Sequence, residues 1–214
     1  MGSANGAKTQ QIISFLGLVV AFILVSYVVR KYQTDIQFLL VHGALLGRVL
    51  FIFLTALFVI FIIPLDIVFL IPVGVSLWGP IATACMSILG WTMGALVAFG
   101  IAKKWGLPAV ALIVGENRVD ALRSRIPTKN LFWSVMLLRM LVPVDLLSYA
   151  LGIFSDMPWG SYVLATLIGV APFGFFFAFA GTLPPWYQIG AFLGAFVLVT
   201  VVLTKYQKTR AVQP

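Results

Sequence analysis

Charged residues are scarce in this sequence, and their scarcity decides the class of protein. Only 9% of the 214 residues are charged, no more than six are acidic, and 62% are hydrophobic. The mean hydropathy is +1.09. Roughly a quarter of the residues of a soluble domain are charged, so this chain lacks the polar surface to cover a soluble globule. The composition predicts an integral membrane protein.

Cysteine and histidine are nearly absent, with Cys85 and His42 as the single examples. One cysteine cannot form an intrachain disulfide, and one histidine excludes a multi-histidine metal site. The sequence also lacks the motifs of zinc proteases, P-loop nucleotide-binding proteins and serine hydrolases of the G-x-S-x-G type. We therefore expect no enzyme, no cofactor and no metal site.

The net charge of +8 does not indicate a nucleic-acid partner. The basic residues stand at the ends of apolar runs, as Arg30, Lys31, Lys103 and Lys104 do. Basic residues in that position anchor and orient membrane spans. We expect membrane lipids, rather than nucleic acid, as the partners of this chain.

Apolar runs and their breaks divide the chain into four parts. We expect a disordered tail over 1–10, an N-terminal transmembrane helix with an interfacial helix over 11–48, and a membrane core over 49–181. A C-terminal transmembrane helix with a basic tail follows over 184–214. Within the core, the expected order is a hairpin at 49–78, a helix at 80–102, a cytoplasmic amphipathic segment at 103–130, a hairpin at 131–152 and a helix at 158–181.

The two hairpin blocks resemble each other. Each contains a P-x-D triplet, then a glycine, and each precedes a spanning helix that contains another glycine. The matched pairs are Pro64 with Pro143, Asp66 with Asp145, Gly74 with Gly152, and Gly90 with Gly169. Proline- and glycine-broken segments at matching places of two halves point to a binding site at the membrane midplane. The pattern predicts an internal repeat.

The distribution of basic residues favours re-entrant hairpins over full spans. If both hairpins enter and leave on one side, ten basic residues share the cytoplasmic side and three, Arg30, Lys31 and Arg48, lie opposite. Full spans give a weaker asymmetry. The predicted fold is thus an all-α polytopic membrane protein with an inverted-topology repeat. In each half a re-entrant hairpin precedes a transmembrane helix, and N- and C-terminal transmembrane helices flank the core.

Asp66, Arg139 and Asp145 are expected within the membrane, with Asp156 near its edge. A charge at that depth costs about 3 kcal/mol and marks a functional candidate. The guanidinium of Arg139 suits a phosphate group, and the two aspartates could load and release a proton. Two structural alternatives stay open: Arg139 and Asp145 form a buried ion pair, or Asp66 caps the helix that follows it.

The run "PVDLLSYALG" (143–152), together with "LLR" ending at Arg139, resembles the DedA/SNARE-associated Golgi protein (VTT-domain) superfamily, in its Golgi-protein-like branch. The glycine-rich runs at 74–106 and 168–181 resemble the helices that follow the hairpins of that family. The resemblance implies two facing re-entrant hairpins. By motif, Asp66 takes the family's acidic position and Arg139 its arginine position, while Asp145 stands near the place of a second arginine.

The same resemblance implies lipid translocation: recycling of undecaprenyl phosphate in some bacterial members and phospholipid scrambling in some eukaryotic ones. We therefore expect a flippase- or scramblase-like transporter of a phospholipid or polyprenyl phosphate, with proton coupling and a homo-oligomer left open. It would reside in a bacterial inner membrane or a eukaryotic endomembrane. The alternatives are a secondary transporter of a small ion or solute and a non-transporting membrane scaffold.

Overall fold

The structure, a computed structural model, describes residues 2–32, 44–63, 66–114, 131–141 and 146–197. Helix accounts for 92% of it, and these five ranges contain no strand. The predicted all-α class is confirmed. Pro64, Pro143 and Asp145 lie outside the described residues, as do 33–43 of the expected interfacial helix, 115–130 of the amphipathic segment and 198–214 of the basic tail.

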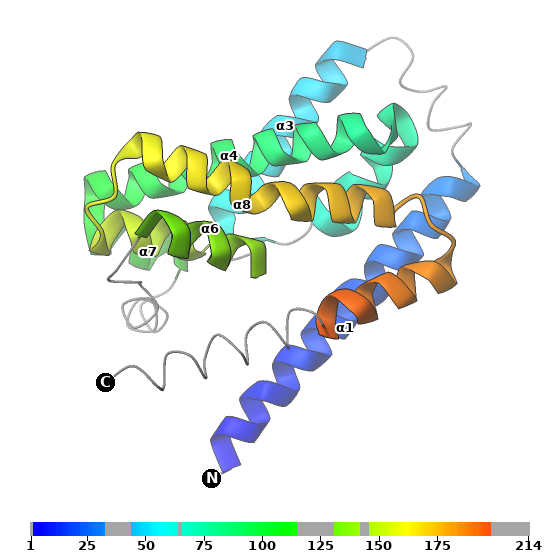
Figure 1. Cartoon of the computed structure of the whole chain (residues 1–214), viewed down its shortest axis with the longest axis horizontal. Helices are drawn as coiled ribbons and strands as arrows, with labels where there is room; N and C mark the ends of the chain where they lie inside the picture. Colours follow the sequence, from blue (N-terminus) through cyan, green and yellow to red (C-terminus); the bar gives the residue numbers. More distant parts are fainter. Residues whose placement is uncertain (1, 33–43, 64–65, 115–130, 142–145, 198–214) are drawn as a thin grey trace.

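The described parts of the chain are almost entirely helical (Figure 1). The order is α1 (Gly2–Lys31), α3 (Ala44–Phe61), η1 (Asp66–Leu70), α4 (Ile71–Val114), α6 (Leu131–Leu141), α7 (Leu146–Phe154) and α8 (Trp159–Ala180). A last described helix covers 185–197. Since α1 begins at Gly2, the expected disordered tail over 1–10 differs from the structure. Ala4, Ala7 and Lys8 favour helix, and no proline interrupts the run into the apolar part.

Two glycines break α4 into three helical pieces. Gly79 has φ 78° and Gly106 has φ 64°, the left-handed region that side chains with a Cβ rarely adopt. Pro80 follows the first break at once, where its fixed φ suits the first position of a new helix. The middle piece corresponds to the expected spanning helix at 80–102.

The chain reverses direction between α3 and the first piece of α4. The Phe51 ring, near the start of α3, meets the Trp78 ring edge-on at 5.7 Å between centroids. A Cβ added at Gly47 would lie 3.3 Å from the same indole. The start of α3 therefore lies beside the end of the 66–78 segment, as in an antiparallel hairpin. At the reversal, Ile62 has φ 58°, a strained value for a β-branched residue.

Two helical runs are long and apolar enough to cross a membrane, Asp66–Leu112 and Trp159–Ala180. This bears out the expectation of membrane-capable helices on both halves of the core. The re-entrant course of the hairpins and the inverted repeat stay predictions, because no membrane is present to define the sides.

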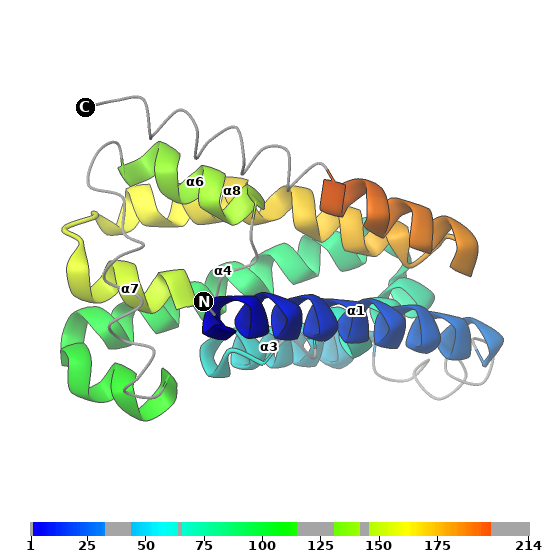
Figure 2. The same cartoon turned by 90° about the horizontal axis from the view of Figure 1, so that it is seen from below.

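Glycines let the core helices approach closely. A Cβ at Gly94 would lie 2.5 Å from the Ala56 carbonyl oxygen of α3, and one at Gly169 would lie 2.7 Å from Cβ of Arg139 on α6. Small residues have this role at helix interfaces in membranes. Figures 1 and 2 show α8 running alongside α4, with α6 against α8. In each half the glycine-bearing helix thus packs on a helix that precedes it.

Hydrogen bonds connect the end of α1 to the residues that follow α8. Arg30, in the last turn of α1, donates from Nη1 to the Thr182 carbonyl at 3.2 Å and from Nη2 to the Leu183 carbonyl. Deeper in the protein, the Phe22 ring packs against Phe177 of α8 and Phe192 of the 185–197 helix. These contacts place the C-terminal ends of α1 and α8 together, on the side that the basic-residue distribution assigns to both.

Candidate functional site

Asp66 is a buried carboxylate at the start of a helix. It is the first residue of η1, just after the reversal of the first hairpin, and is 4% exposed. The Trp91 indole Nε1 donates a hydrogen bond to its Oδ2, and backbone hydrogen bonds at Asp66 and Ile67 also reach it. A helix N-terminus favours a negative charge. These contacts fit the capping role and leave the carboxylate in the protein interior.

Arg139 is the basic counterpart, in the last turn of α6 and also 4% exposed. Its Nη2 donates to the Ser148 hydroxyl of α7 and to the Tyr162 hydroxyl of α8, both at 2.8 Å. The guanidinium carbon lies 5.5 Å from the centre of the Tyr162 ring. Its Nε is buried and has no acceptor among the described residues. In the described part of the chain, Arg139 is held by neutral groups rather than by a carboxylate.

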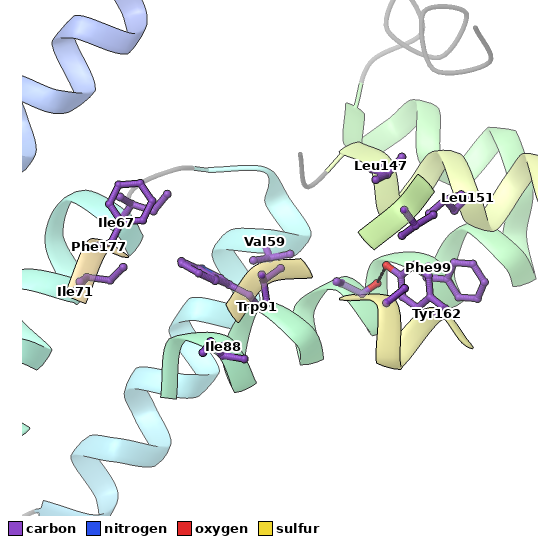
Figure 3. Close-up of a cluster of buried hydrophobic side chains, with 14 of the residues drawn as sticks. Val59, Ile67, Ile71, Ile88, Trp91, Phe99, Leu147, Leu151, Tyr162 and Phe177 are labelled. Carbon is purple, nitrogen blue, oxygen red and sulfur yellow. Dashed lines mark hydrogen bonds between the residues drawn. The ribbon is translucent and has the colours of Figure 1, made fainter. Parts of the chain in front are cut away.

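Tyr162 connects this cluster to the backbone of α4. Its ring is fully buried and stacks on Phe99, with centroids 4.1 Å apart (Figure 3). Its hydroxyl accepts from Arg139 and donates to the Ala95 carbonyl at 3.0 Å. A tyrosine hydroxyl has one proton to donate, so these two bonds fix its orientation. The position of the guanidinium follows from that of α4.

The acidic and basic clusters meet the same face of α4. Trp91 donates a hydrogen bond to Asp66, and the Ala95 carbonyl accepts one from Tyr162. These two residues of α4 are four positions apart, so they lie on the same helix face, about 6 Å from each other along the axis. Trp91 lies twelve residues beyond the Gly79 break, or about 18 Å at 1.5 Å per residue. The middle piece of α4 covers 80–105 and is about 39 Å long, so Trp91 and Ala95 both lie in its central part.

A further contact links the two hairpins directly. Tyr149 of α7 is fully buried, and its hydroxyl donates to the Ile60 carbonyl at the end of α3 at 2.6 Å. Ile60 is two residues before the strained Ile62. The second hairpin therefore supplies a donor to the reversal of the first, where the helix end leaves carbonyls without helical partners.

Three buried hydroxyls lie on the core helices α3, α4 and α8. Thr55, Ser87 and Thr166 each have a buried side-chain oxygen with no partner among the described residues. Ser87 precedes Trp91 by one helical turn, and Thr166 follows Tyr162 by one turn, so both lie on the faces that carry the clusters. Buried polar atoms usually have a partner, and such atoms are places where water or a polar ligand group binds.

The two glycines predicted to break the hairpin blocks lie inside helices instead: Gly74 is in the first piece of α4, and Gly152 is in α7. Gly74 and Gly152 lie at close contacts, with an added Cβ 2.9 Å from Phe51 and 2.6 Å from Ala102, respectively. Asp156 is exposed between α7 and α8. No group of three metal-ligating side chains occurs in the described ranges.

The sequence reasoning missed Trp91, Ser148 and Tyr162. The Trp91 ring is buried among Val59 and Ile88 (Figure 3). Its position in the middle of a 22-residue apolar run could have signalled this. Ser148 lies inside the LLSYALG motif, one residue before Tyr149, but only the packing of α8 reveals its partner.

Comparison with known proteins identifies one family. Residues 63–183, more than half of the chain, match the sequence model of the VTT domain. The match covers both charged clusters and all of α4, α7 and α8. No curated protein and no solved structure matches the chain at a significant level.

Proposed function

The chain belongs to the VTT-domain family, that of the DedA and SNARE-associated Golgi proteins, and on this premise we propose that it moves an anionic lipid between the two leaflets of its membrane. Members of this family are membrane proteins linked to transport. The proposed substrate is a phospholipid or a polyprenyl phosphate. A lipid of this kind needs a polar route for its phosphate, because the hydrocarbon core offers none.

The observation that carries the proposal is the environment of Arg139. Its charge is buried in the protein interior, yet its described partners, Ser148 and Tyr162, are neutral. Neutral donors and acceptors orient a guanidinium without cancelling its charge. A phosphate could then accept from the remaining N–H groups in the forked geometry that arginine favours.

Asp66 would handle protons in this scheme. Its carboxylate accepts a hydrogen bond from Trp91, which lies one helical turn before Ala95, the α4 residue that binds Tyr162 of the basic cluster. Protonation would remove the negative charge as the phosphate approaches, and release would restore it. Coupling of lipid movement to a proton gradient is the expected consequence, and it follows only if Asp66 changes its protonation state during transport.

The proposal is tested with the purified chain in liposomes that carry a fluorescent phospholipid in both leaflets. A membrane-impermeant reductant bleaches the outer leaflet alone unless lipid exchanges. We expect bleaching to exceed the outer-leaflet half with the unaltered chain, and to return to the level of empty liposomes with Arg139→Gln. Arg48→Gln is the matched control, because Arg48 is an exposed arginine near the start of α3 and belongs to neither cluster.

Other outcomes assign other functions. Full activity of folded Arg139→Gln removes the phosphate role, and activity lost equally in Arg139→Gln and Asp145→Asn but restored when both are combined supports a buried ion pair instead. Movement of protons or solute without lipid indicates a small-ion carrier. A chain that moves neither lipid nor solute is a scaffold.

A further inference from the structure

An apolar groove runs between α1 and the 185–197 helix, away from the two charged clusters. Its volume is about 480 Å³, which lies within the range of small-molecule sites. One wall consists of Leu16, Val20 and Leu24 of α1, and the other includes Ile189 and Leu193. Both helices are seen beside each other in Figure 1 (blue and orange). The buried Phe22–Phe192 contact joins the two helices below the groove.

The side chains that form the walls are open rather than packed. Leu16, Val20, Leu24 and Leu193 are each more than half exposed. The same residues belong to the apolar part of α1 and to the expected C-terminal span, so they face hydrocarbon. A polypeptide occupant would need partners for its backbone amides, and the groove walls are apolar side chains. A hydrocarbon chain fits such walls without that requirement.

One end of the groove is cationic. Arg30 lies six residues beyond Leu24 on α1, about 9 Å along the helix axis. Its three described hydrogen bonds, to the carbonyls of Ser26, Thr182 and Leu183, use three of its five N–H donors and fix the guanidinium there. Lys31 is exposed beside it. Trp186 and Tyr187 lie at the beginning of the 185–197 helix, which forms the opposite wall, and their rings are exposed. Exposed aromatic rings are typical of a membrane interface.

We propose that this groove is a binding site for one anionic phospholipid, with an acyl chain between α1 and the 185–197 helix and the phosphate at Arg30 and Lys31. The charge of the pair complements a phosphate, and the apolar walls complement the chain. The site is separate from the Arg139 cluster, and the lipid bound there is a resident one rather than the transported one. The inference therefore goes beyond lipid translocation and does not require it.

The test uses the full chain in phosphatidylcholine vesicles with a trace of phosphatidylglycerol that carries a photoreactive group at the end of its acyl chain. After irradiation, adducts are mapped on peptides by mass spectrometry. We expect adducts on peptides covering 16–24 and 189–193 to exceed those on the peptide around Val97, an exposed residue of α4, by about tenfold. Equal labelling of all three peptides indicates ordinary surrounding lipid and overturns the proposal.

Variants locate the two ends of the lipid. Val20→Trp with Leu193→Trp fills the groove and should lower its labelling to the Val97 level, whereas Val97→Trp, the matched control, should leave groove labelling unchanged. Arg30→Gln with Lys31→Gln should lower labelling by the phosphatidylglycerol probe about tenfold. Unchanged groove labelling after filling overturns the site, and unchanged labelling after charge removal overturns the phosphate assignment.

A competition measurement on the unaltered chain tests the proposal even if a variant fails to fold. Excess unlabelled phosphatidylglycerol should suppress labelling of the groove peptides in the unaltered chain and leave the Val97 peptide unaffected. Suppression at both places to the same degree overturns the proposal. The labelling is read without any transport measurement, so its failure and the failure of lipid translocation are distinguishable.

Discussion

The two halves of the core hold opposite charges by opposite means. Asp66 begins a helix and is bound by a single side chain, Trp91, of the helix that follows. Arg139 ends a helix and is bound by two side chains, of which Tyr162 is itself anchored to α4. Each charge stands at the helix end whose dipole favours it. The comparison shows that each of the two buried residues is bound by neutral groups among the described residues.

The acidic half is therefore a capped helix end, and the basic half is a network. A cap depends on one bond and on the local backbone. A network distributes its bonds over α6, α7, α8 and α4, so removal of one member disturbs several others. The predictions below test this contrast, in order of the effect that we expect on the free energy of unfolding.

The largest effect is expected where glycine lets helices touch. Gly94→Leu should destabilise the fold by about 3 kcal/mol or more, because even its Cβ would overlap the Ala56 carbonyl oxygen. Gly169→Leu should destabilise the fold by a similar amount, because an added Cβ would lie 2.7 Å from Cβ of Arg139 and 2.9 Å from the Met136 carbonyl oxygen, and neither atom can move without the α6 backbone. Thermal unfolding in detergent measures both. Gly194→Leu, with no atom within 4 Å of an added Cβ, should be nearly neutral.

The second-largest loss of stability is expected when the Tyr162 hydroxyl is removed from the basic network. Tyr162→Phe leaves one buried N–H of Arg139 without its acceptor and removes the bond that anchors the cluster to the Ala95 carbonyl, and we expect a loss of about 2–3 kcal/mol. Chemical or thermal unfolding in micelles gives the value. Tyr187→Phe removes a hydroxyl from an exposed ring and should change stability by less than 0.5 kcal/mol or so. Equal losses in the two variants would contradict the network.

The acidic half should lose less stability when its one side-chain hydrogen bond, from Trp91 to Asp66, is removed. Trp91→Phe takes the N–H away from Asp66, and a hydrogen bond to a charged group contributes about 1.5–3 kcal/mol, of which we expect the lower end because backbone bonds remain. A double-mutant cycle with Asp66→Asn isolates the pairwise energy. A coupling near zero would show that the indole does not hold the carboxylate.

The smallest effect is expected at the link between the hairpins. Tyr149→Phe removes the bond to the Ile60 carbonyl, a neutral hydrogen bond that contributes about 1 kcal/mol. Hydrogen exchange of the amides at the end of α3 should increase, since this bond steadies the reversal near Ile62. Protection unchanged at those amides would mean that the two hairpins are not coupled there.

Local signals in the sequence predicted much of the helical order. The Gly79-Pro80 and Gly106-x-Pro108 breaks act through backbone conformation, which depends on the residues themselves, so the spanning helix between them was predictable. The start of α1 was not, because helix propensity in a polar segment is a weak signal and the segment continues an apolar helix. The outcome there differs from the expected tail.

The site was predictable in its charges but not in their partners. Asp66 and Arg139 are conspicuous because charge is costly in an apolar run. Trp91, Ser148 and Tyr162 are ordinary residues for a membrane helix, and their roles arise from contacts between segments 9 to 25 residues apart. Periodicity within one helix does not contain that information. The expected place of Asp145 within the membrane stays a prediction, since Asp145 lies outside the described residues.

The central claim is that the two hairpins dip into the membrane from opposite sides and bring Asp66 and Arg139 to its centre. Sidedness of labelling tests it most directly. In a Cys85→Ser background, single cysteines are placed at four exposed positions that flank the hairpins: Leu45, Ile81, Trp133 and Asp156. A membrane-impermeant thiol reagent is then applied to sealed vesicles of known orientation.

We predict that cysteines at 45 and 81 react from the outer side, and that cysteines at 133 and 156 react only after the vesicles are opened. Reaction of 45 and 81 from different sides, or of 133 and 156 from different sides, would mean that a hairpin crosses the membrane. That result would contradict the account.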